Sequence, residues 1–263
     1  MNEKLKSPIT LISHGRSGTS LVQNIFDAHP DISVAGETAD LIFSTWYSLW
    51  RAKGIVPGLM ENGKVVPWKQ RAARGVRSVF NEIFNLETQY WMQKPIGQPF
   101  VSSYLRKQGS TLDEWFELYW SILDDVFPTG KFITILRQPC DVVLSAKGYW
   151  DRDESQIWSD IATMARCILH ESSKITYAVN FDELVQQPEQ TSQKLFSHLD
   201  IPYDSTILKA FGHIYVPNKD GWKQDKSSFE GKVKKNFSRR DEWDKLDLSV
   251  PNPDDLKVIE KLW

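Results

Sequence analysis

The feature that most constrains the fold is a short apolar run that stops at a loop rich in glycine and hydroxyl side chains. Residues 8–20 read PITLISHGRSGTS, and an amphipathic pattern follows at once over residues 21–26. This order is typical of a strand, a tight turn and a helix, an arrangement that holds phosphate on backbone N–H groups. A nucleotide triphosphate loop reads GxxxxGK[ST], whereas here Gly15 and Gly18 stand closer together and Thr19 occupies the lysine position. The loop therefore predicts an anion site but disfavours transfer of a γ-phosphate.

The rest of the chain repeats this alternation of short apolar strands and helices. Strands are predicted over 8–13, 31–35, 88–95, 130–139 and 174–179, and helices over 19–28, 39–50, 68–85, 111–126, 140–150, 155–172 and 188–199. No hairpin signature is found, so the pattern predicts a central parallel sheet with helices on both faces. We expect a single α/β domain over residues 1–263, with ligands beyond the carboxyl ends of the strands. Turn residues predict a turn at 36–38 and a loop over 53–67.

Composition sets the broad class of the protein. Its 263 residues are 41 % hydrophobic and 25 % charged, with a formal net charge of −2, so nothing favours nucleic acid or an anionic membrane as a partner. Cys140 and Cys167 lie far apart and are expected to be buried thiols rather than a disulfide. With no run of eighteen apolar residues and no signal-peptide pattern, we expect a soluble, cytoplasmic protein.

A basic segment near the carboxyl terminus departs from this average. Residues 218–240 hold eight basic and three acidic side chains. Two interpretations stay open: a solvated basic loop, or a mobile flap that closes over a polyanionic ligand.

A second candidate anion element follows the strand predicted at 130–139. Arg137 ends that strand and Ser145 lies two helical turns further on, in ILRQPCDVVLS. A guanidinium and a hydroxyl can together hold a phosphate, although a surface arginine near a helical serine remains the alternative. Two anion sites at two strand ends suggest a ligand that is phosphorylated at both ends.

Three stretches, in this order, resemble the sulfotransferases that use 3′-phosphoadenosine 5′-phosphosulfate (PAPS). GRSGTSLVQNIFDAHPDISVAGET is similar to their 5′-phosphosulfate loop, above all in the tyrosylprotein sulfotransferases. FITILRQPCDVVLS resembles their 3′-phosphate element, and YAVNFDELVQQPEQTSQKLFSHLDIPYD resembles a later signature. The resemblance covers most of residues 8–205 and is closer overall to compact bacterial members. It implies a P-loop-like fold and sulfuryl transfer from PAPS without a metal.

The resemblance also implies where PAPS binds. The 3′-phosphate is assigned to Arg137 and Ser145. The 5′-phosphosulfate is assigned to the loop residues Gly15, Arg16, Ser17, Gly18, Thr19 and Ser20. The closing signature of the family is matched only loosely, so three lysines of the basic segment are candidates for contacts with PAPS: Lys232, Lys234 and Lys235.

Three residues receive catalytic roles from the resemblance. Glu37 is the implied general base, although an acidic residue at a helix N-terminus is also favoured by the helix dipole. Lys94 is expected to neutralise charge on the bridging oxygen, with a structural lysine as the alternative, and Arg16 is expected to assist. We interpret His14 as a support of the loop and His29 as structural.

The predicted acceptor site consists of aromatic side chains and one carboxylate. Aromatic faces beside carboxylates suit a cation, unless they only pack and cap a helix; the candidates are Trp46, Trp50, Trp91, Tyr149, Trp150 and Asp151. We expect a small-molecule acceptor, in particular a cationic compound from natural-product biosynthesis, sulfated on oxygen or nitrogen. The alternatives are a carbohydrate or peptidyl-tyrosine acceptor, a P-loop kinase of small metabolites, and a non-catalytic nucleotide-binding protein. The sequence does not indicate an oligomeric state.

Overall fold

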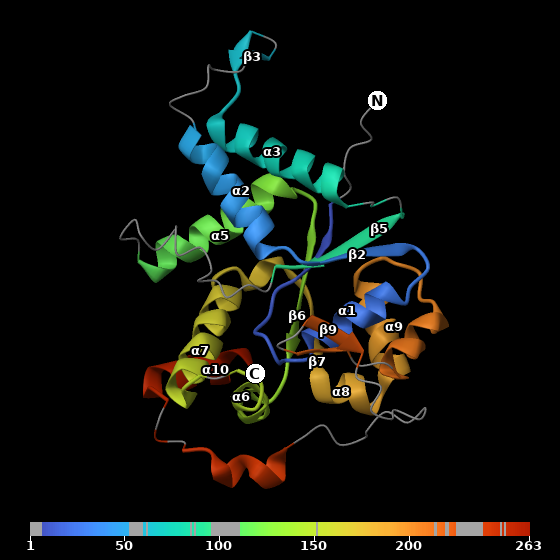
Figure 1. Cartoon of the computed structure of the whole chain (residues 1–263), viewed down its shortest axis with the longest axis vertical. Coiled ribbons are helices and arrows are strands. Elements are labelled where there is room, and N and C mark those ends of the chain that lie inside the picture. Colours follow the sequence, from blue (N-terminus) through green and yellow to red (C-terminus); the bar gives the residue numbers. More distant parts are fainter. Residues whose placement is uncertain are drawn as a thin grey trace.

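A five-stranded parallel sheet forms the centre of the protein (Figure 1). The computed structural model describes residues 7–52, 60–61, 63–84, 86, 88–95, 111–150, 152–212, 215–218, 221–224, 239–247, 249 and 251–263. The strand order is β2-β5-β1-β6-β7, with bounds Ile32–Glu37, Tyr90–Lys94, Ile9–Leu11, Lys131–Leu136 and Ile175–Asn180. Every pairing within this sheet is parallel, which confirms the predicted fold class.

Helices cover both faces of the sheet (Figure 1). One face packs against α1 (Thr19–Asp27), α8 (Phe181–Gln186), α9 (Pro188–His198) and the 3-10 segment η3 (Ser205–Gly212). The other packs against α2 (Ala39–Arg51), α3 (Trp68–Ile83), α5 (Leu112–Val126) and α7 (Glu154–His170). Trp91 and Met92 of β5 lie in opposite cores because successive strand side chains point to opposite faces.

A third apolar cluster lies at the amino-terminal half of α7. It joins α6 (Pro139–Lys147) and α10 (Pro253–Leu262) to the 3-10 segment η4 (Arg240–Lys245). Helix α6 begins at Pro139, where a missing N–H costs nothing because first-turn N–H groups have no helical partner. The carboxyl-terminal part of the chain therefore packs beside the helix that follows β6.

Two details of the sequence prediction are wrong. Within the loop expected at 53–67, β3 (Met60–Glu61) and β4 (Lys64–Val65) form an antiparallel pair, with Gly63 between them at φ +74°. In the basic region, β8 (Tyr215–Asn218) and β9 (Gly221–Gln224) form a second antiparallel pair. Strands of two to four residues are too short to show the alternation by which hairpins are predicted.

Candidate active site

Three chain segments meet at the carboxyl edge of the sheet. The loop over residues 12–18 follows the central strand β1, while Lys94 and Glu37 end β5 and β2 on one side of it. Arg137 follows β6 on the other side. Because parallel strands end at the same edge, all predicted polar clusters are gathered there, as the sequence indicates.

The loop after β1 has the shape of an anion cradle. Gly18 is the N-cap of α1 at φ +101°, and a Cβ there would lie 2.4 Å from Phe181 Cδ2. The first turn of α1 carries no acidic side chain, so the positive end of its dipole is not neutralised from within the helix. Ser17 is 0 % exposed, and its Oγ has no hydrogen-bond partner among the described residues. These features fit a bound phosphate-like group.

The two predicted anion elements are in direct contact. Arg16 Nε donates to Ser145 Oγ at 3.2 Å, and Arg137 Nη1 donates to the Arg16 carbonyl at 3.1 Å. The guanidinium carbons lie 4.3 Å from the ring centroid of Tyr149 for Arg16 and 4.6 Å from that of Phe181 for Arg137. The two cations therefore belong to one cluster that spans the ends of β1 and β6.

Burial disfavours the charged form of both guanidinium groups. It lowers the pKa of the Arg16 guanidinium and that of the Arg137 guanidinium. For Arg137, Asp141 and Asp182 raise the pKa, while the nearby charge of Arg16 lowers it further. A bound dianion would relieve the repulsion between the two guanidinium groups, so the electrostatics favour a polyphosphorylated ligand.

On the other side of β1, Lys94 and Glu37 form an ion pair. Lys94 Nζ lies 3.2 Å from Glu37 Oε1; the lysine side chain is 2 % exposed and the glutamate side chain 56 %. Burial lowers the pKa of the Lys94 ammonium, and the charge of Glu37 opposes that shift. A buried cation is thus held beside an accessible carboxylate, which is the arrangement expected of an electrostatic stabiliser next to a general base.

A bulge in β2 brings this pair together. Val34 pairs with Met92, but Gly36 pairs with the next residue of β5, so Ala35 is an extra residue in the strand. The extra residue turns Glu37 to the same face of the sheet as Lys94, its partner in register. Glu37 therefore lies at a strand end rather than in the turn predicted at 36–38, and that prediction is wrong.

The two histidines make structural contacts. His14 Nδ1 donates to the Gly15 carbonyl at 2.5 Å, and burial lowers the pKa of His14 to about 4. His29 Nε2 donates to the Pro202 carbonyl at 2.9 Å, and its Nδ1 accepts from the Asp31 N–H at 3.1 Å. His14 thus holds the loop from within as a neutral ring, which supports the interpretation of both residues.

The predicted acceptor aromatics divide into two groups. Tyr149 packs against Arg16, and Trp150 lies against Gly15, where an added Cβ would be 2.8 Å from its ring. Trp46 is buried in the core and stacks on Trp50, with centroids 6.3 Å apart. Trp91 is also a core residue, while Asp151, Lys232, Lys234, Lys235 and most of the predicted flap lie outside the described residues. The substrate-binding roles stay predictions.

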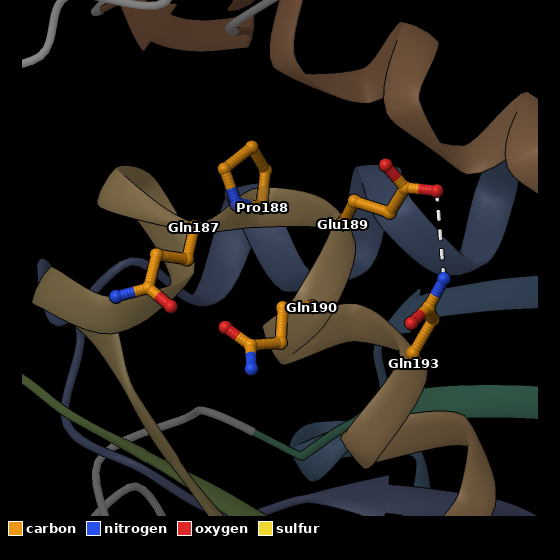
Figure 2. Close-up of a pocket in the computed structure, with 5 residues that line it drawn as sticks. All are labelled: Gln187, Pro188, Glu189, Gln190 and Gln193. Carbon is orange, nitrogen blue, oxygen red and sulfur yellow. Dashed lines mark hydrogen bonds between the residues drawn. The ribbon is translucent and has the colours of Figure 1, made fainter.

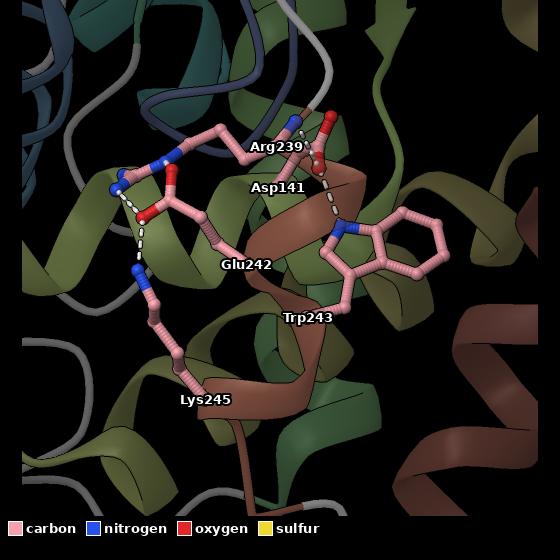
Figure 3. A network of polar contacts seen from close by, with 5 residues as sticks. All are labelled: Asp141, Arg239, Glu242, Trp243 and Lys245. Atoms are coloured by element: carbon pink, nitrogen blue, oxygen red, sulfur yellow. Dashed lines mark hydrogen bonds and ion pairs between the residues drawn. The ribbon is translucent and has the colours of Figure 1, made fainter.

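A polar network beside α6 was not predicted from the sequence. Asp141 is 0 % exposed; its Oδ1 accepts from the Arg239 N–H at 3.1 Å and from Trp243 Nε1 at 2.6 Å. Arg239 also forms a two-pronged ion pair with Glu242, which Lys245 joins (Figure 3). The carboxylate thus ties the end of the basic segment to the helix that carries Ser145.

A separate hollow lies at the start of α9 and contains none of the predicted site residues (Figure 2). Its lining is three glutamines with Pro188 and Glu189, and Gln193 Nε2 donates to Glu189 Oε1 at 3.4 Å. Across the described ranges, no three His, Cys, Asp or Glu side chains gather into a group that could hold a metal ion. Within the same residues, no helix has the length and apolar character that a membrane span requires.

Comparisons with known proteins fit this site. The protein has an α/β fold, and an anion cradle lies at the carboxyl edge of its parallel sheet. Residues 8–205 match the model of the sulfotransferase family, and the chain belongs to that family.

A curated relative is a putative protein-tyrosine sulfotransferase of Caenorhabditis briggsae, 24 % identical over 210 residues, or 73 % of this chain. The match spans 65 % of that relative, which is just under two thirds of its length. The sulfotransferase domain of the Synechococcus PCC 7002 olefin synthase has a TM-score of 0.58 at 19 % identity and covers 99 % of this chain and 96 % of its own. The sulfotransferase domain from the curacin biosynthetic pathway has a TM-score of 0.58 at 15 % identity, with 99 % and 98 % covered. These two structures share the fold.

Proposed function

We propose that this protein transfers a sulfuryl group from PAPS to a hydroxyl or amine nitrogen of a small-molecule acceptor. The observation that carries the proposal is the pair formed by buried Lys94 and exposed Glu37, next to a cationic loop that fits a phosphate-like group. Membership of the sulfotransferase family supports the choice of sulfur over phosphorus. A cytoplasmic location and a place in natural-product biosynthesis are part of the same proposal.

In this proposal the donor lies across the ends of β1 and β6. The amide groups of residues 17–20 and the Arg16 guanidinium bind the 5′-phosphosulfate, and Arg137 with Ser145 binds the 3′-phosphate. The acceptor oxygen or nitrogen bonds to sulfur as the bond from sulfur to the bridging oxygen breaks, and adenosine 3′,5′-bisphosphate leaves. Lys94 stabilises the negative charge that develops on that oxygen, and Glu37 takes the proton of the acceptor.

Calorimetry with adenosine 3′,5′-bisphosphate tests the donor assignment. We expect binding in the presence of a metal chelator, and a large loss of affinity in Arg137→Ala. A matched control is Arg166→Ala, because Arg166 pairs with Asp255 between α7 and α10 and is not part of the site. Binding of ATP with magnesium in place of the bisphosphate would identify a kinase instead.

Turnover separates an enzyme from a non-catalytic nucleotide-binding protein. The protein is incubated with PAPS and cell extract, and mass spectrometry identifies any compound that gains a sulfuryl group. Glu37→Gln should keep its affinity for the bisphosphate and lose about 10²–10⁴-fold in kcat, the usual contribution of a general base. Unchanged turnover in this variant would remove Glu37 from catalysis.

Peptidyl tyrosine is the second candidate acceptor. It is favoured by the name of the Caenorhabditis relative, which is a putative protein-tyrosine sulfotransferase. Sulfation of a synthetic acidic peptide that contains one tyrosine, and not of the compounds in the extract, would select this alternative.

A further inference from the structure

A groove of about 330 Å³ lies between α1 and the edge strand β2. Its helix side is polar and consists of Ser20, Gln23, Asn24 and Asp27, while its strand side is formed by residues 34–36. The volume falls at the lower end of the range for small-molecule pockets, which is about 300–1,000 Å³. The groove is therefore large enough for a slender ligand.

The groove adjoins the proposed catalytic pair. Met92 faces the core on the α1 side of the sheet, so Lys94, two residues further along β5, points to the same side. The bulge in β2 places Glu37 there as well. Gly36 lines the groove directly before Glu37, and Ser20 belongs both to the groove and to the predicted phosphosulfate loop. The groove thus begins where acceptor and donor have to meet.

The strand order separates this groove from the nucleotide. Arg137 and Ser145 follow β6, on one side of the central loop, whereas β2 and β5 lie on the other side. A nucleotide that reaches from the loop to Arg137 extends away from β2. The groove is thus left on the side where the acceptor enters.

The chemistry of the groove indicates what it can recognise. Its helix side offers two amides, one hydroxyl and the carboxylate of Asp27, and the lining that the described residues supply includes no Lys or Arg. Gln23 Oε1 is buried without a hydrogen-bond partner among the described residues, so a rotation of this amide would let a ligand donor supply one. The strand side adds apolar contact from Val34, while Ala35 packs against the core on the other face of the sheet. Hydrogen-bond donors and positive charge are favoured, and anions are not.

We propose that this groove is an acceptor subsite for an elongated amino alcohol, which places its hydroxyl near Glu37 and its ammonium group near Asp27. The inference rests on the proposed sulfotransferase function and adds the class of acceptor. Ser20 and Asp27 are seven residues apart, so the two ends of the helix side are separated by about 10 Å along α1. A six-carbon chain with a polar group at each end matches this length and packs on the apolar strand side.

Three probes that differ at one end test the subsite: 6-aminohexanol, 1,6-hexanediol and 6-hydroxyhexanoate. Ligand-detected NMR titrations use protein saturated with adenosine 3′,5′-bisphosphate. The amine should bind about fivefold more tightly than the diol, as one exposed ion pair allows, and the carboxylate should bind most weakly. Absence of binding by the amine, or equal affinity for all three probes, overturns the proposal.

Substitutions that change the charge at Asp27 test whether this carboxylate causes the preference for the amine. Asp27→Asn should bring the affinity for the amine down to that for the diol, and Asp27→Lys should favour the carboxylate. Asp31→Asn removes the same charge from an exposed neighbour outside the groove and should leave the order of the probes unchanged. An unaltered order in Asp27→Asn overturns the subsite. If the bisphosphate binds and the amine does not, only the subsite fails; if the bisphosphate does not bind, the proposed function fails as well.

Discussion

Replacement of Gly36 by alanine tests whether the β2 bulge positions Glu37, the proposed general base. Gly36 has φ +73°, and an added Cβ would meet no atom within 4 Å, so the substitution has no steric term. A left-handed conformation costs an L-residue about 1–2 kcal/mol. Alanine also restricts the unfolded chain, which offsets about 0.4–1 kcal/mol of that cost. The free energy of unfolding should therefore fall by about 1 kcal/mol in Gly36→Ala.

Gly63 provides a matched control. It lies between β3 and β4 at φ +74°, and an added Cβ there also meets nothing within 4 Å. Gly63→Ala should lose the same stability in urea denaturation. Only Gly36→Ala should lose turnover, because relaxation of the bulge moves Glu37 away from Lys94 and a displacement of about 1 Å can cost about 100-fold in rate.

The assay compares kcat and bisphosphate affinity in the two variants, with the acceptor that mass spectrometry identifies. We expect kcat to fall by about 10–100-fold in Gly36→Ala, with unchanged affinity for adenosine 3′,5′-bisphosphate. Full activity of Gly36→Ala at the predicted stability loss would refute the role of the bulge. Equal losses of turnover in both glycine variants would refute it too, since strain alone would then explain the result.

Three further predictions follow from buried groups. Lys94→Met should abolish turnover yet raise the free energy of unfolding at neutral pH, because the lowered pKa of Lys94 means that its charge is disfavoured in the folded protein. This gain in stability should shrink as the pH rises toward 10.5, where Lys94 of the unfolded chain also loses its proton. Lys131→Met, which removes the exposed ion pair with Asp200, should show neither effect. Burial lowers the pKa of His14 from 6.5 to about 4, so below pH 6.5 protons bind the unfolded chain more readily than the folded protein. The free energy of unfolding should therefore fall by about 3 kcal/mol as the pH falls from 6.5 to 4. His14→Gln should remove this part of the pH dependence in urea titrations. Trp243→Phe, which removes one donor to Asp141, should speed amide hydrogen exchange over residues 240–245 without changing the Tm by more than a few degrees, and a protected segment would contradict the network.

The position of the two predicted anion elements at one edge of the sheet could be predicted from the sequence because it depends on short-range order. A strand that ends at a glycine-rich loop, and another that ends at Arg137, must meet at one edge of a parallel sheet. This step requires no knowledge of distant packing. The hydrogen bond from Arg16 to Ser145 is not predicted, because the sequence assigns Ser145 with Arg137 to a second phosphate.

The other parts depend on contacts that the sequence does not encode locally. A helix N-terminal Asp is usually favoured by the dipole alone, so nothing near Asp141 indicates that residues about 100 positions later bury it. The bulge at Ala35 is equally hidden, because it is a property of the register between β2 and β5. A shift of one residue decides which face Glu37 occupies, and short-range patterns do not determine such a shift.

The strand order suits the proposed reaction, in which one sheet serves two substrates of opposite charge. Displacement at sulfur requires the acceptor to approach on the side opposite the departing phosphate. The central position of β1 places the loop between Arg137, after β6, and the Lys94–Glu37 pair, after β5 and β2. In the proposed reaction the cationic cluster therefore binds the nucleotide on one side, while the carboxylates of Glu37 and Asp27 lie on the other. Substitutions after β6 should then change the KM for the donor, and substitutions along β2 and the outer face of α1 should change the KM for the acceptor.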